Sequence, residues 1–130
     1  MVVQNALFFG RGKASALVTP RVTFTSPEVA SVGTLEHDAV RRGIAVDTVT
    51  IPLHDVDRAR IDDEDSGFCT MVLARGTDRI LGATIVAEHA GETIGEVVLA
   101  MNERLGLSAI GRAMHPYPTQ AEVLRKAADA

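Results

Sequence analysis

The alternation of apolar and polar positions predicts four strands. Residues 21–25, 45–53, 67–75 and 79–88 are rich in Val, Ile, Thr and Phe, the residue types that strands favour. Gly76-Thr77-Asp78 has the length of a hairpin connection, so the last two strands are predicted to pair antiparallel.

Stretches with apolar residues at helical spacing lie between these strands and after them. Four helices are predicted, over residues 34–42, 91–105, 108–111 and 120–128. Thr34 is expected to cap the first of them and Gly43 to end it. Ser26-Pro27-Glu28 has the pattern of a further short helix start, because Ser caps, Pro suits the first position and Glu favours the positive end of the dipole.

This order of elements predicts an α+β domain. A hairpin-connected antiparallel sheet is expected, with helices packed on one face and the other face directed towards a dimer partner. Residues 20–130 are expected to form this one domain. Residues 1–19 are interpreted as a connector from a missing upstream domain. Within the connector, Gly10-Arg11-Gly12-Lys13 could cradle a phosphate, but the context of a strand before it and a helix after it is lacking.

Composition narrows the function classes. The chain has 130 residues, 46% of them hydrophobic, which suffices for a single core. A net charge of −4 and scattered basic residues argue against a nucleic-acid partner. The single cysteine rules out an internal disulfide and suits a cytoplasmic protein. No apolar run is long enough for a membrane span.

No complete catalytic set stands in the chain. It has no paired cysteines, no nucleophile elbow and no dinucleotide fingerprint. The four histidines lack metal-ligand spacing. The acidic run at 62–65 lacks the pattern of a calcium loop and is interpreted as part of a solvated polar loop over 54–66.

The segment from His115 to Glu122 is the most informative. Pro116 and Pro118 restrict the backbone on both sides of Tyr117, the only tyrosine. Thr119-Gln120-Ala121-Glu122 has the pattern of a capping box. Two interpretations remain open: a turn that only leads into the last helix, or a rigid arm that presents a polar aromatic side chain to a site.

Several motifs resemble one known family in order and spacing. They are Val22–Gly33, Arg79–Val86, Ala90–Ile94 and Pro116–Glu122. Together they resemble the carboxy-terminal dimerisation domain of the pyridine nucleotide-disulfide oxidoreductases, over about residues 20 to 128. The mercuric-reductase-like and dihydrolipoamide-dehydrogenase-like branches are the most similar.

The resemblance implies a homodimer within an FAD- and NAD(P)H-dependent oxidoreductase whose cofactors are held by upstream domains. It implies that this domain donates residues in trans to the partner's active site and has no catalysis alone. Lipoamide and glutathione reductases carry a general acid/base His before Pro-Thr and a Glu that orients it. Here Tyr117 stands at the His position, Glu122 matches the Glu, and His115 matches an upstream His of lipoamide dehydrogenases.

The sequence departs from the family at this point. A phenol is a poor substitute for imidazole at neutral pH. The cysteine pair that ends mercuric reductases has no counterpart at 126–130, and Cys69 is expected to be a small buried residue. Efficient mercury handling is therefore not expected. The alternative from another class is a stand-alone α+β module that binds a small ligand or regulates.

Overall fold

The computed structural model describes residues 2–13 and 17–130. Its strands are β1 (Arg21–Thr23), β2 (Glu28–Gly33), β3 (Val46–Pro52), β4 (Phe68–Ala74) and β5 (Ile80–Ala87). Its helices are α1 (Val2–Leu7), α2 (Glu36–Arg41), the 3-10 turn η2 (Leu53–Asp55), α3 (Asp57–Ile61), α4 (Ala90–Asn102), α5 (Leu107–Arg112) and α6 (Glu122–Asp129).

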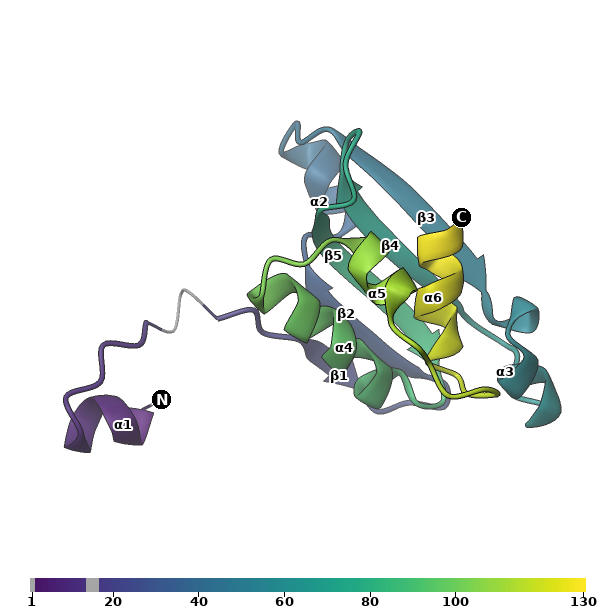
Figure 1. Ribbon diagram of the computed structural model, residues 1–130, viewed down its shortest axis with the longest axis horizontal. Helices are drawn as coiled ribbons and strands as arrows, with labels where there is room; N and C mark the ends of the chain where they lie inside the picture. Colours follow the sequence, from purple (N-terminus) through teal and green to yellow (C-terminus); the bar gives the residue numbers. More distant parts are fainter. Residues whose placement is uncertain (1, 14–16) are drawn as a thin grey trace.

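The strands form one five-stranded sheet in the order β1-β2-β5-β4-β3, with every neighbouring pair antiparallel. Helices α4, α5 and α6 lie together across one face of this sheet (Figure 1). The predicted α+β fold and the predicted β4–β5 hairpin are therefore confirmed.

The core lies between that face and these helices. Alternate residues of the central strands, such as Met71 and Ile85, are completely buried. They belong to one cluster with Ile94 of α4 and Leu124 of α6. Because α6 contributes fully buried side chains, the segment that leads into it is fixed to the core at its carboxy-terminal end.

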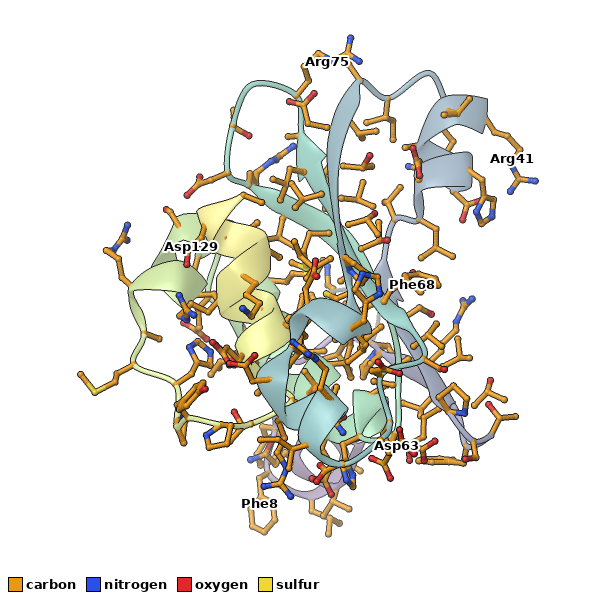
Figure 2. All side chains as sticks on the ribbon, turned by 90° about the vertical axis from the view of Figure 1, so that its right-hand side faces the viewer. Phe8, Arg41, Asp63, Phe68, Arg75 and Asp129 are labelled. Atoms are coloured by element: carbon orange, nitrogen blue, oxygen red, sulfur yellow. The ribbon has the colours of Figure 1, made fainter. Side chains whose placement is uncertain are left out.

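The opposite face is covered at one end by the connection from β2 to β3. The backbone of Thr34 passes directly over Gly82, where an added Cβ would lie 2.2 Å from the Thr34 oxygen. Helix α2 follows, and its Ala39 is fully buried. In Figure 2, Arg41 of α2 and Phe68 lie on one side of the sheet and Asp129 of α6 on the other.

Three sequence predictions are wrong in detail. Residues 26–28 do not start a helix: Ser26 and Pro27 form a turn, and Glu28 begins strand β2, which the sequence analysis did not predict. Helix α2 begins after Leu35, without the expected side-chain cap from Thr34. The polar stretch 54–66 contains α3 instead of being a loop throughout.

The expected connector, residues 1–19, lies partly outside the described residues. Its described part includes α1, and the last residue of this helix, Leu7, is exposed together with Phe8 and Phe9 that follow it. The stretch Gly10–Lys13 follows this helix, and no strand precedes it among the described residues, whereas a strand comes before a phosphate-binding turn.

Candidate functional site

The segment between α5 and α6 makes the predicted bend. The Tyr117–Pro118 peptide bond is cis, and the Thr119 hydroxyl donates a hydrogen bond to the Pro116 carbonyl oxygen at 2.8 Å. The predicted capping box is wrong, because Ala121 precedes α6 and no side chain caps the helix. The Thr119 side chain instead stabilises a turn within this segment through its hydrogen bond to Pro116. We call residues 113–121 the elbow.

Tyr117 lies at the outside of the elbow. Its side chain is exposed (70%), and its hydroxyl donates a hydrogen bond of 2.8 Å to Oδ2 of Asp57. This hydrogen bond, together with the negative charges of Asp57 and, more weakly, Glu122, raises the pKa of the Tyr117 phenol. The phenol is therefore protonated at neutral pH and can donate a hydrogen bond.

Glu122 is buried at the first turn of α6. Its Oε1 accepts a hydrogen bond of 2.7 Å from Nη2 of Arg125 one turn further on, and this bond raises the pKa of the Arg125 guanidinium. Its Oε2 is buried and finds no partner among the described residues. The sequence placed Glu122 beside Tyr117, but the described hydrogen bonds do not join the two side chains.

His115 is held in the interior at the start of the elbow. Its side chain is 7% exposed. Nε2 lies 3.1 Å from Oε1 of Glu96 on α4, and Nδ1 lies 3.1 Å from the Ala113 carbonyl oxygen. Both ring nitrogens therefore face acceptors, and the ring ties the elbow to α4. The buried position of His115 contrasts with the exposed position of Tyr117.

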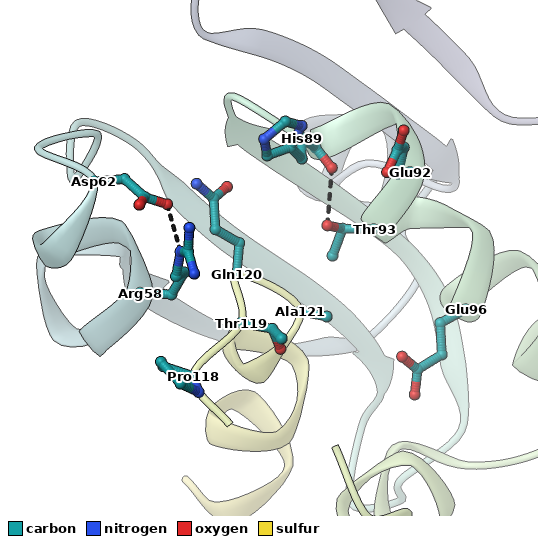
Figure 3. A pocket seen from close by; sticks show the side chains of 10 residues that line it. All are labelled: Arg58, Asp62, His89, Glu92, Thr93, Glu96, Pro118, Thr119, Gln120 and Ala121. Atoms are coloured by element: carbon teal, nitrogen blue, oxygen red, sulfur yellow. Dashed lines mark hydrogen bonds and ion pairs between the residues drawn. The ribbon is translucent and has the colours of Figure 1, made fainter. Parts of the chain in front are cut away.

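A pocket of about 380 Å³ lies beside the elbow, between the start of α4 and the region of α3 (Figure 3). It is lined by Arg58, Asp62, His89, Glu92, Thr93, Glu96, Pro118, Thr119, Gln120 and Ala121. Gln120 is buried on its wall; its Nε2 donates to Glu64, 3.2 Å away, while its Oε1 has no described partner. Arg58 on its wall pairs with Asp62, while Glu92 and Glu96 add two further carboxylates, so the walls carry a net negative charge.

Flavin and dinucleotide phosphates are typically held by a glycine-rich turn between a strand and a helix. Such a turn is lacking among the described residues. They contain no group of three or more possible metal ligands. Cys69 is buried, and burial raises the pKa of its thiol to about 12, so it is a poor nucleophile.

Two of the interacting residues carry no signal in the sequence pattern. Asp57 lies in the stretch interpreted as a solvated loop, and Glu96 lies on the polar side of a predicted helix. Their contacts to Tyr117 and His115 join positions 60 and 19 residues apart. Nothing in the local pattern signals these pairs, which depend on the tertiary fold.

Helices of membrane-spanning length and apolarity do not occur in the described part of the chain.

Comparison with sequences identifies relatives. The family model of the pyridine nucleotide-disulphide oxidoreductase dimerisation domain matches residues 19–128. The mercuric reductase of Streptomyces lividans is 38% identical over 98% of this chain and 27% of its own length. The mitochondrial dihydrolipoyl dehydrogenase of Dictyostelium discoideum is 37% identical over 92% of this chain and 24% of its own length.

Solved structures agree. The HOCl-induced flavoprotein disulfide reductase RclA of Escherichia coli superposes with a TM-score of 0.88 at 25% identity, over 96% of this chain and 29% of its own. LpdA of Mycobacterium tuberculosis gives the same TM-score and identity, over 98% of this chain and 28% of its own. The chain thus spans about a quarter of the length of the relatives it matches. These matches favour a dimerisation domain over a stand-alone ligand-binding or regulatory module. The chain belongs to the pyridine nucleotide-disulphide oxidoreductase family, of which it is the dimerisation domain.

Proposed function

We propose that two copies of this chain form a homodimer and that the elbow of each supplies Tyr117 to a redox site of the other. The parent would be an FAD- and NAD(P)H-dependent reductase, with both cofactors bound by upstream domains. The flavin would supply the electron transfer, and this chain's own residues would hold and orient a hydrogen-bond donor. A cytoplasmic location suits the single, buried Cys69.

The observation that carries the proposal is the elbow itself. Its base is fixed by the buried His115 and Glu122, while Tyr117 at its outer side is exposed. A polar aromatic group on a fixed support is typical of a residue that must meet another molecule in a defined position. Within one chain, Asp57 is the one described hydrogen-bond partner of the Tyr117 hydroxyl.

The sheet offers a surface for the second copy. Val29, Val86 and Phe68 are cross-strand neighbours on β2, β5 and β4. They lie on the face opposite α4, α5 and α6, and Val29 and Phe68 are 39% and 38% exposed. An apolar row on a sheet face favours burial against a partner.

Sedimentation equilibrium of the chain tests the dimer. Phe68→Glu would bury a charge at the proposed interface and is expected to shift the equilibrium to monomer. Leu99→Glu, at a 61% exposed position on α4, is the matched control and should leave the dimer intact. A monomeric wild type at high micromolar concentration would refute self-association, and dissociation by Leu99→Glu alone would move the interface to the helical face.

Turnover of the full-length reductase tests the role of Tyr117. Tyr117→Phe keeps the ring and removes the hydroxyl, so kcat is expected to fall about 100-fold if the hydroxyl transfers a proton in the transition state. Arg75→Ala, at the exposed hairpin tip, serves as the control. An unchanged kcat for every dithiol and metal substrate tried would refute the role.

A further inference from the structure

Asp57 is held in place by the core although it lies in a mostly polar stretch of the sequence. It is the first residue of α3, and Val56 directly before it and Ala59 two residues after it are fully buried. Because these two side chains fix the short helix to the core, the carboxylate of Asp57 has a defined position. A residue in a solvated loop would not have one.

The carboxylate meets the only tyrosine of the chain. The Tyr117 hydroxyl lies 2.8 Å from Asp57 Oδ2, a good distance for a hydrogen bond to a charged acceptor. Glu122 is closer in sequence, but its Oε1 accepts from Arg125 and no described hydrogen bond joins it to the phenol. Of the two carboxylates near the phenol, Asp57 is the one that contacts it.

The contact with Asp57 changes the pKa of the Tyr117 phenol. The hydrogen bond to Asp57 is the largest cause of the raised pKa of Tyr117, and the charge of Asp57 is the next. A carboxylate acceptor favours the neutral phenol and directs its O–H bond along one line. An imidazole oriented by a carboxylate is comparable, because the partner fixes the direction of the ring and its tautomer.

We propose that Asp57 is the positioning residue of Tyr117, taking the orienting role that the family resemblance implies for Glu122. The orienting residue differs because the side chain at position 117 is a tyrosine where the family pattern has a histidine. A phenol reaches further from the backbone than an imidazole and meets α3, while Glu122 pairs with Arg125 and stabilises α6. The catalytic consequence rests on the proposed function; the Asp57–Tyr117 pair itself does not.

The pair can be tested in this chain without activity. Since the chain has one tyrosine and no tryptophan, phenolate absorbance in a spectrophotometric pH titration reports Tyr117 alone. Asp57→Asn is expected to lower the titration midpoint. Asp55→Asn, an equal loss of charge two residues away beside His54, is the control and should leave the midpoint unchanged. Equal midpoints for wild type and Asp57→Asn, or a larger decrease with Glu122→Gln, would overturn the proposal.

A second experiment in the full-length reductase tests the positioning role. Asp57→Asn is expected to lower kcat about ten-fold or more, the effect of losing a hydrogen bond to a charged group, and to move the alkaline limb of the pH profile to lower pH. Asp57→Glu should restore part of the rate. If Tyr117→Phe lowers kcat but Asp57→Asn leaves kcat and the alkaline limb unchanged, the positioning role is refuted. If Tyr117→Phe leaves the rate unchanged, the proposed function fails while the absorbance titration still decides the pair.

Discussion

Removing the cation that faces Glu122 should destabilise the chain out of proportion to a surface ion pair. In Arg125→Met the side chain keeps its length, but Oε1 of Glu122 loses its donor while Oε2 already has no described partner. The Glu122 side chain is only 7% exposed, so its buried negative charge then has no cation to compensate it. Because charges are poorly solvated in the interior, the folded state loses free energy.

The magnitude follows from the burial of the two partners. Breaking a fully buried ion pair costs about 3–5 kcal/mol. The Arg125 side chain is 37% exposed, so water can replace part of its contribution. We therefore expect a loss of about 2 kcal/mol in the free energy of unfolding, after that reduction. Arg125 also pairs with Asp129 at 2.6 Å, an exposed contact that should contribute no more than about 0.5 kcal/mol.

Urea unfolding at a fixed protein concentration, which keeps any dimer contribution constant, measures this loss. With a typical slope, 2 kcal/mol lowers the midpoint by roughly 1 M urea. Asp129→Asn isolates the exposed pair, and the double variant Glu122→Gln/Arg125→Met should recover more than half of the loss. A loss in Arg125→Met no greater than that in Asp129→Asn would refute the reasoning.

Three further outcomes are expected. Gly33→Ala should lower the temperature of thermal unfolding more than Gly43→Ala. Both glycines have a positive φ (+71° and +65°), but only at Gly33 would an added Cβ lie 2.2 Å from the Leu81 carbonyl oxygen. The Cys69 thiol should react with a disulfide reagent only after denaturation, and because its pKa is raised to about 12, the stability it contributes falls as pH rises above about 9. The Ser108 hydrogen bond lowers the pKa of Asp78, so Ser108→Ala should cost stability at neutral pH and cost less as pH falls through the folded-state pKa, as acid unfolding can show.

The fold was largely predictable because its strongest signals are local. The β4–β5 hairpin follows from two alternating runs around Gly76-Thr77-Asp78, and α4 follows from one apolar stripe. Strand β2 was missed because Ser26-Pro27-Glu28 carries residues that also start helices. This local pattern is compatible with a helix start and with a strand, and pairing with β5 makes these residues lead into a strand.

The candidate site was predictable in its position but not in its contacts. Two prolines marked the elbow and placed Tyr117 on it. Thr119, however, donates its hydrogen bond back to Pro116 instead of capping α6. Asp57 could not be identified because its helix has five residues, too few for a periodic signal, and depends on tertiary packing.

The exposure of Tyr117 has a consequence for how such proteins diversify. The core and the buried supports at His115 and Glu122 do not depend on which side chain stands at position 117. Replacements there change the side chain that the elbow presents while leaving folding intact, since exposed positions tolerate substitution with little change in stability. Under the proposed function, selection can therefore exchange one presented group for another at a single codon without redesign of the scaffold.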